Sequence, residues 1–155
     1  MDTIKLISGH EIPVLGLGTW QLQGIKCKEA VKTALKLGYN HIDTAWIYDN
    51  QKEIGLALQE SKIPRKKLFI TSKVWRDELR YKDVLSQCDE NLKQLQTDYL
   101  DLYLIHWPNA GIPMEETFRA LHELLKKGKV KSIGVSNFTI NHLKEAKKIF
   151  KSNFS

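Results

Sequence analysis

The sequence predicts an α/β protein of the (β/α)₈ barrel type in which about five of the eight strand–helix units are present. Three observations favour this fold. Short apolar segments alternate with helical segments, polar residues gather where the apolar segments end, and no linker or change in composition interrupts the alternation. Residues 1–155 are therefore expected to form one partial barrel domain.

A β-hairpin is expected before the main fold. Two short segments with apolar residues, 3–7 and 12–14, flank the turn Ser8–Glu11. The first barrel strand is expected at Val14–Gly18. The helix after it ends at Gly38 and carries apolar residues at 3.6-residue spacing, namely Cys27, Ala30, Val31, Ala34 and Leu35.

The second unit begins with a strand at Asn40–Ala45. Its helix is expected to run through Leu58, because Asn50 with Glu53 three residues later resembles an asparagine version of the capping box. The third unit has a strand at Leu68–Val74. The helix that follows presents one apolar stripe, formed by Val84, Leu85, Cys88, Leu92 and Leu95.

The last two units follow the same pattern. The fourth strand is expected at Tyr99–His106 and its helix at about Met114–Lys127. The fifth strand is expected at Val130–Val135, and Thr139 can cap a final helix that runs to about Phe150. Strict succession of strand and helix indicates a parallel sheet covered by helices.

A doubly wound sheet would offer the same alternation, and the positions of the polar residues decide against it. That fold would place a glycine fingerprint after the first strand, but Gln21 stands where the third glycine of the fingerprint is needed. A barrel instead collects functional residues at the carboxyl ends of successive strands. Each expected strand ends in such residues: Thr19-Trp20, Asp43, Lys73, His106 and Ser136-Asn137.

The composition excludes several classes of protein. Lys and Arg number 24 against 18 Asp and Glu, a net charge of +6, but no exposed aromatics or nucleic-acid-binding module accompany the basic runs. Attraction of an anionic cofactor explains this positive charge better than binding of nucleic acid does. Cys27 and Cys88 stand far apart, which argues against a disulfide framework and a metal site. No apolar run approaches the roughly 20 residues of a membrane span, so we expect a cytoplasmic protein.

The residue types at the strand ends suit the reduction of a carbonyl group. Hydride addition leaves an alkoxide that needs a proton, and Tyr48 can donate it if the Lys73 ammonium stabilises the phenolate. Asp43 would keep Lys73 charged, and His106 could donate a ring N–H to the carbonyl oxygen. Taken singly, each residue also has an ordinary structural explanation, as a strand-end lysine, a cap or a core histidine. Only the chemical explanation accounts for all of them together.

The reaction also needs a hydride source, which no side chain supplies, so we expect a nicotinamide cofactor. Ser136 and Asn137 could hold its carboxamide, although both could also cap the last helix. Four tryptophans follow or lie near strand ends and are expected to form an apolar rim. Among them, Trp20 and Trp107 are the candidates for substrate contact, together with His106.

Five ordered segments of the chain resemble the aldo-keto reductase family: Gly16–Trp20, His41–Asn50, Thr71–Trp75, Asp98–Pro108 and Lys131–Phe138. The resemblance implies Tyr48 as general acid, Lys73 and Asp43 as the residues that tune it, and His106 as the residue that orients the carbonyl. It further implies NADPH as cofactor, without excluding NADH, held by Gly18, Thr19, Asp43, Ser136 and Asn137. Gln51 departs from the family, which commonly has Glu there.

The length of the chain is a larger departure, because a closed barrel of this type has about 250 residues. We expect the isolated chain to bind NADPH poorly and to turn over negligibly. Three explanations stay open: a fragment of a reductase, a half that assembles with a separate C-terminal half or with itself through open barrel edges, and a non-catalytic cofactor-binding or interaction protein. The partner implied is a small carbonyl substrate, and aldehydes, ketones and sugars stay open.

Overall fold

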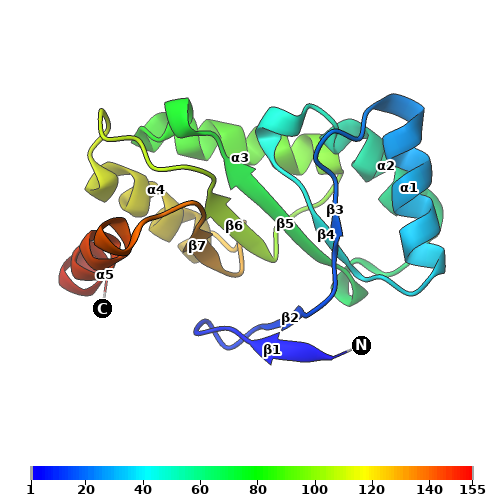
Figure 1. Ribbon diagram of the computed structural model, residues 1–155, viewed down its shortest axis with the longest axis horizontal. Helices are drawn as coiled ribbons and strands as arrows, with labels where there is room; N and C mark the ends of the chain where they lie inside the picture. Colours follow the sequence, from blue (N-terminus) through cyan, green and yellow to red (C-terminus); the bar gives the residue numbers. More distant parts are fainter. Residues whose placement is uncertain (1, 155) are drawn as a thin grey trace.

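A computed structural model describes residues 2–154, and its centre is a five-stranded parallel sheet (Figure 1). The strands are β3 (Leu17–Gly18), β4 (His41–Asp43), β5 (Phe69–Val74), β6 (Leu102–Ile105) and β7 (Ile133–Val135). Their order in the sheet is their order in the sequence. A doubly wound sheet reverses its strand order at a switch point, whereas a barrel does not, so the sheet is the predicted partial barrel.

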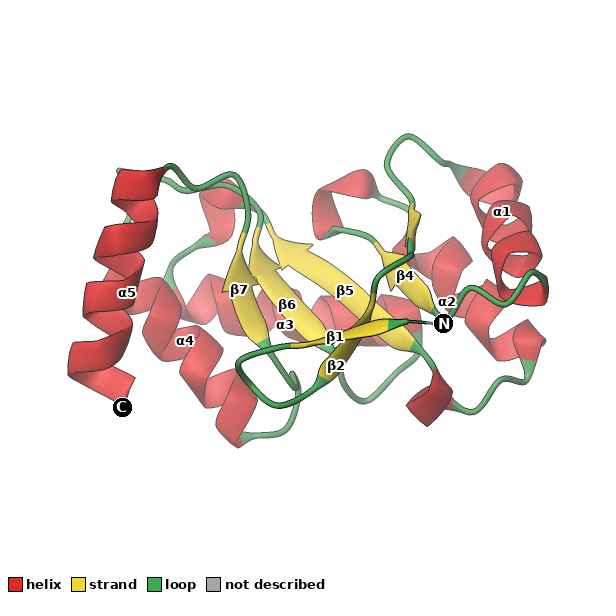
Figure 2. Ribbon diagram, turned by 60° about the horizontal axis from the view of Figure 1, so that its bottom comes forward, coloured by secondary structure: helices red, strands yellow, loops and turns green. Residues whose placement is uncertain are grey.

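Helices follow the strands and cover one side of the sheet. They are α1 (Gly24–Lys36), α2 (Gln51–Ser61), α3 (Tyr81–Leu95), α4 (Met114–Lys126) and α5 (Ile140–Phe154), with short 3₁₀ turns η1 (Trp46–Tyr48), η2 (Arg65–Lys67) and η3 (Arg76–Glu78). Figure 2 shows α2, α3 and α4 behind the strands, with α1 and α5 at opposite ends. Within residues 2–154, no helix is long and apolar enough to cross a bilayer.

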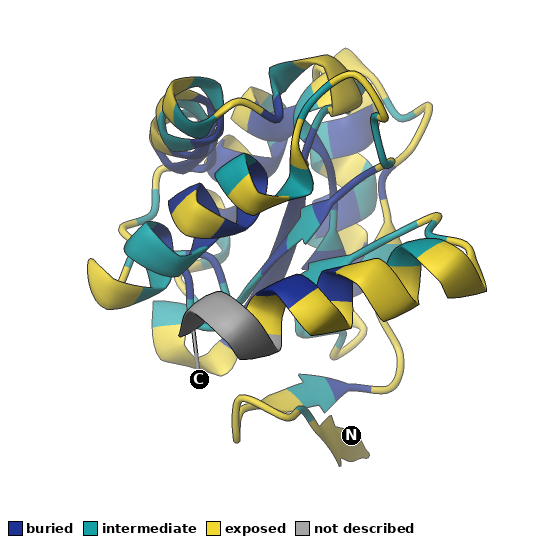
Figure 3. Cartoon of the chain, turned by 90° about the vertical axis from the view of Figure 1, so that its left-hand side faces the viewer, coloured by how far each residue is buried: buried dark blue, intermediate teal, exposed yellow. Residues whose placement is uncertain are grey.

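The expected hairpin lies at the amino-terminal ends of the strands. It consists of β1 (Thr3–Lys5) and β2 (Glu11–Pro13), which pair in antiparallel fashion (Figure 1). Most of it is exposed (Figure 3). Its turn contacts the barrel through the hydroxyls of Ser8 and Ser132, 2.6 Å apart. The opposite end of the sheet is left free for the polar residues.

The register of the sheet separates a face that packs on the helices from an opposite face, where the polar strand-end residues lie beside Leu102 and Leu104. Residues paired across parallel strands share a face. Ile70 and Tyr103, with the residues paired to them such as Ile42 and Ser72, therefore point toward the helices. This face is almost completely buried, and its members include Ile42, Ile70, Val74, Tyr103 and Ile105. Asp43, Thr71 and Lys73 lie on the other face. Burying each large apolar side chain stabilises the fold by about 1.5–3 kcal/mol, and this packing holds the opposite face in place.

All five predicted strands are present, but most are shorter than expected. The apolar pattern predicts Val14 and Leu15 in the first strand, yet both are half exposed and only Leu17–Gly18 pairs with β4. Likewise, Leu100 and Val130 form an isolated bridge ahead of β6 and β7. Apolar runs mark where a strand can be buried, whereas the ladder also requires a hydrogen-bonding partner alongside.

Predictions about helix ends had mixed outcomes. Gly38 has a positive φ of 92°, as expected of a residue that ends a helix. The Thr139 hydroxyl accepts a hydrogen bond from the backbone N–H of His142 and so caps α5, which extends beyond Phe150 to Phe154. The predicted capping box at Asn50 was wrong, because its side chain makes no cap hydrogen bond. Helix α2 thus forgoes a cap of about 1 kcal/mol.

Candidate functional site

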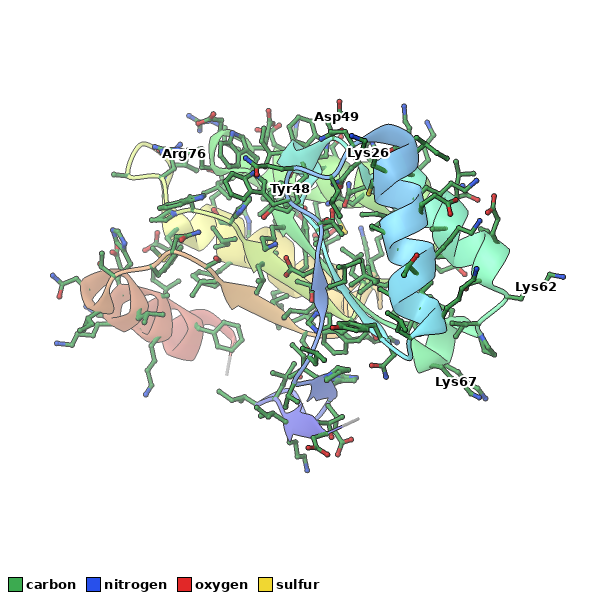
Figure 4. The ribbon with its side chains drawn as sticks, turned by 45° about the vertical axis from the view of Figure 1, so that its right-hand side comes forward. Lys26, Tyr48, Asp49, Lys62, Lys67 and Arg76 are labelled. Atoms are coloured by element: carbon green, nitrogen blue, oxygen red, sulfur yellow. The ribbon has the colours of Figure 1, made fainter. Side chains whose placement is uncertain are left out.

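The carboxyl ends of the strands bring together the residues that the sequence singled out. Asp43 is the last residue of β4, Lys73 lies near the end of β5, and His106 follows β6 directly. Tyr48 ends η1, the 3₁₀ turn between β4 and α2. Figure 4 shows Tyr48 in the upper half of the molecule, away from the hairpin. The parallel sheet therefore delivers all four predicted side chains to one edge.

Lys73 is the centre of the cluster. Its Nζ donates hydrogen bonds to Asp43 Oδ1 at 2.6 Å and to the backbone carbonyl of Thr44 at 2.9 Å, and it lies 3.5 Å from Tyr48 Oη. The Lys73 side chain is 8% exposed, whereas the Asp43 side chain is 35% exposed. A buried ammonium needs a counter-charge and further acceptors, and Asp43 and the Thr44 carbonyl provide them.

His106 completes the cluster from β6. Its Nε2 lies 3.5 Å from Tyr48 Oη, and the Trp75 ring meets the imidazole edge to face at 5.4 Å. Burial, aided by the charge of Lys73 and opposed by that of Asp43, lowers the pKa of His106 from 6.5 to about 4. The imidazole is therefore neutral at physiological pH and carries one N–H. Among the described residues, its buried Nδ1 has no hydrogen-bond partner.

The predicted cofactor residues occupy the neighbouring strand ends. The amide Nδ2 of Asn137 donates to the backbone carbonyl of His106 at 2.8 Å, and the backbone N–H of Ser136 donates to the carbonyl of Ile105. Both residues follow β7. These bonds tie the end of β7 to the end of β6. The hydroxyl and amide expected to hold a carboxamide thus lie beside the cluster of Asp43, Lys73, Tyr48 and His106.

The first strand places its residues differently. Gly18 is exposed, and the space around its Cα is open. Thr19 is fully buried, and both its backbone N–H and its hydroxyl donate to the carbonyl of Asp43 at 3.0 Å. The Thr19 side chain therefore supports Asp43 from within the protein. Its cofactor contact stays a prediction.

The aromatic residues at the site are exposed to different degrees. Trp20 is 68% exposed and Trp107 is 43% exposed, so both present large apolar surfaces at the strand ends. Trp75 is partly buried against His106. The first two can contact a bound molecule, while Trp75 orients the imidazole.

Sequence reasoning missed three groups that support the site. They are the carbonyl of Thr44, which binds Lys73, the amide of Gln23, which donates to the carbonyl of Tyr48 at 2.6 Å, and the side chain of Asn50. No sequence signal marks a backbone carbonyl as a ligand. For Asn50 the sequence pattern predicts a helix cap, whereas its amide binds the carbonyls of Thr19 and Leu22.

Gln51, the departure from the family pattern, lies on the helix-facing side of the sheet. It is fully buried and accepts a hydrogen bond from Ser72 Oγ at 2.7 Å. Its own Nε2 donates to Asn91 Oδ1 at 2.7 Å, and Asn91 Nδ2 is 3.3 Å from the hydroxyl of Tyr103. The amide thus uses both its donor and its acceptor, and these polar groups are paired beneath the site.

Fold and site together define a class of protein: a partial (β/α) barrel with a lysine–aspartate pair, a tyrosine and a histidine in contact at the carboxyl ends of its strands. A sequence model of the Aldo/keto reductase family matches residues 14–155. The chain belongs to the aldo-keto reductase family, as its motifs indicated.

Characterised proteins and solved structures agree with this assignment. The chain is 48% identical over 145 residues to the glyoxal reductase of Bacillus subtilis, covering 93% of this chain and 52% of that protein. It is 47% identical over 137 residues to the methylglyoxal reductase DkgB of Salmonella typhi, covering 87% and 51%. An aldo/keto reductase from Brucella melitensis superposes with a TM-score of 0.91 at 44% identity, covering 99% of this chain and 59% of that one. The chain spans about half the length of the curated relatives it matches.

Proposed function

We propose that this chain carries the proton-donating residues of a nicotinamide-dependent carbonyl reductase. One observation supports the proposal above others: the Lys73 ammonium contacts both Asp43 and the hydroxyl of Tyr48, and the His106 ring approaches the same hydroxyl. A proton donor, a cation to stabilise the conjugate base and a neutral N–H donor therefore meet at one point.

In this reaction the hydroxyl of Tyr48 donates its proton to the carbonyl oxygen as negative charge develops there. The adjacent Lys73 ammonium stabilises the tyrosinate that remains, and the Asp43 carboxylate compensates the buried ammonium. His106 is neutral and carries a single ring N–H. We place this proton on Nε2, the nitrogen that faces Tyr48. From there it donates to the same oxygen and stabilises the transition state.

A bound nicotinamide cofactor supplies the hydride in such a reduction. The residues present suit it, because the Ser136 hydroxyl and the Asn137 amide lie next to His106 and can bind a carboxamide. Asp43, whose carboxylate is partly exposed, can accept from the same group. The net charge of +6 favours an anionic dinucleotide. NADPH is the proposed form, since an aldo-keto reductase complexed with NADPH superposes with a TM-score of 0.88 at 39% identity, covering 93% of this chain and 50% of that one.

Small α-oxo aldehydes are the substrates proposed first. Relatives in Bacillus subtilis and Salmonella typhi are a glyoxal reductase and a methylglyoxal reductase, at 48% and 47% identity. Trp20 and Trp107 offer apolar surface beside the cluster for the body of such a substrate. The aldehyde oxygen would then lie between Tyr48 and His106.

The test joins this chain to the second half of the Bacillus subtilis glyoxal reductase, since the chain spans about half of that protein. NADPH oxidation with methylglyoxal is followed by absorbance in the fused protein and in its Tyr48→Phe variant. We expect removal of the hydroxyl to lower kcat by about 100-fold or more, as for loss of a general acid. Tyr99→Phe is the control, because its ring stacks on Arg65, and it should retain activity. Equal activity of the Tyr48→Phe variant, or NADPH binding without reduction, would contradict the proposal.

A further inference from the structure

Asn50 lies at the meeting point of the loops that carry the proton donor. It is completely buried, although it stands at the start of α2, where a short polar side chain commonly faces the helix end. Its side chain turns away from the helix toward the loops that follow β3 and β4. Because the buried Asn50 side chain does not cap α2, its amide needs hydrogen-bond partners elsewhere in the protein.

Both ends of the Asn50 amide are used. Nδ2 donates to the backbone carbonyls of Thr19 at 2.8 Å and Leu22 at 2.9 Å, and Oδ1 accepts from the Thr44 hydroxyl at 3.0 Å. Two donors and one acceptor on a planar group are what an asparagine offers. Aspartate could not donate to the two carbonyls, and a hydroxyl residue has only one hydrogen.

These bonds close a ring through the acid–base cluster. Thr19, held by Asn50, donates twice to the carbonyl of Asp43, and Thr44, also held by Asn50, accepts from the Lys73 ammonium through its carbonyl. Asp43 and Lys73 are themselves paired. Asn50 therefore fixes the backbone on both sides of that ion pair.

The same residue anchors the Tyr48 segment. Tyr48 and Asn50 are separated only by Asp49, whose left-handed φ of 50° turns the chain sharply. With Asn50 fixed by its side chain, this turn sets the direction from which Tyr48 enters the site. Gln23 completes the arrangement, because its amide donates to the carbonyl of Tyr48.

We propose that Asn50 is a positioning residue: its buried amide sets the placement of Tyr48 and of the Asp43–Lys73 pair relative to each other. The inference rests on the proposed function for its chemical meaning. The geometry itself can be tested in the chain without cofactor or turnover.

The experiment records the ¹³Cζ resonances of labelled tyrosine in the chain 1–155, with Tyr48 assigned through Tyr48→Phe. We expect Asn50→Ala to shift or broaden the Tyr48 resonance, since its segment loses three hydrogen bonds. Asn91→Ala is the matched control, because Asn91 is equally buried but pairs with Gln51 and Tyr103 on the helix-facing side. It should leave the Tyr48 resonance in place.

A second variant, Thr44→Val, guards against loss of folding in Asn50→Ala. It removes only the hydroxyl that donates to Asn50 and keeps the shape and the backbone carbonyl that binds Lys73. A smaller shift of the same resonance is expected. An unchanged Tyr48 resonance in a folded Asn50→Ala variant, or in Thr44→Val if the former does not fold, would overturn the inference, as would an equal shift in Asn91→Ala. A reductase test that fails while these shifts appear would reject the proposed function and retain the positioning role.

Discussion

Protonation of His106 is expected to weaken the fold below pH 6.5. Burial is the first cause that lowers the pKa of this imidazole from 6.5 to about 4, and the charge of Lys73 acts in the same direction. The unfolded chain regains the ordinary pKa, so between these two values it binds more protons than the folded chain. The free energy of unfolding must therefore fall as the pH decreases through this window.

The size of the effect follows from the two pKa values. Integrating the proton uptake of His106 from pH 8 to pH 5 gives a loss of about 2 kcal/mol, which grows to about 3 kcal/mol at pH 4. Above pH 7 the contribution vanishes, because the imidazole is neutral in both states. Burial also lowers the pKa of His41, which destabilises the fold in the same direction. The contribution of His106 must therefore be isolated with a variant.

Urea unfolding of the chain and of its His106→Gln variant at pH 8 and pH 5 provides the assay. Glutamine cannot take up a proton in this range, so the variant should lose about 2 kcal/mol less than the parent on acidification. Any packing defect of the variant cancels, because only the difference between the two pH values is compared. His41→Gln serves as the companion and should leave the His106 contribution intact. Losses that agree within about 0.5 kcal/mol in the parent and the His106→Gln variant would refute the reasoning.

Two further predictions concern the packing beneath the site. Gly55→Ala should lower the free energy of unfolding by about 1–3 kcal/mol in urea titrations, because an added Cβ would lie 2.4 Å from the carbonyl oxygen of Gln94, a backbone atom that cannot move alone. Unchanged stability would show that α2 and α3 can separate freely. Burial raises the pKa of Cys27 to about 11 and of Cys88 to about 12, so both thiols should react with a disulfide reagent at pH 8 at least about 100-fold more slowly in the folded chain than in denaturant. Similar rates in the two conditions would contradict the burial of these thiols.

The order of strands and the edge that carries the site could be read from the sequence. Each expected strand is an apolar run that ends in a polar residue, and parallel strands with intervening helices bring those ends to one edge. The contact of Lys73 with Asp43 followed from chemistry, since a buried ammonium at that edge requires a carboxylate. The hydrophobic pattern was sufficient to predict the strand order, and charge balance was sufficient to predict the Lys73–Asp43 contact, because both can be read from the residue types alone.

Other features depend on tertiary contacts that no local pattern encodes. Asn50 precedes a helix, and its sequence environment is the same whether its amide caps that helix or binds the carbonyls of Thr19 and Leu22. Which of the two its amide does depends on the position of the loop after β3, because that loop carries both carbonyls. The imidazole nitrogen that faces Tyr48 is likewise fixed by the ring orientation against Trp75.

The two sides of the site are supported differently by the sheet. Asp43 and Lys73 lie in β4 and β5 and His106 follows β6, and each of these strands has a neighbour on both sides within the described sheet. Ser136 and Asn137 follow β7, which pairs there with β6 alone. A strand held on one side has fewer ladder hydrogen bonds to resist displacement. Within the described sheet, the bond from Asn137 to the carbonyl of His106 therefore adds a tie between the end of β7 and the end of β6.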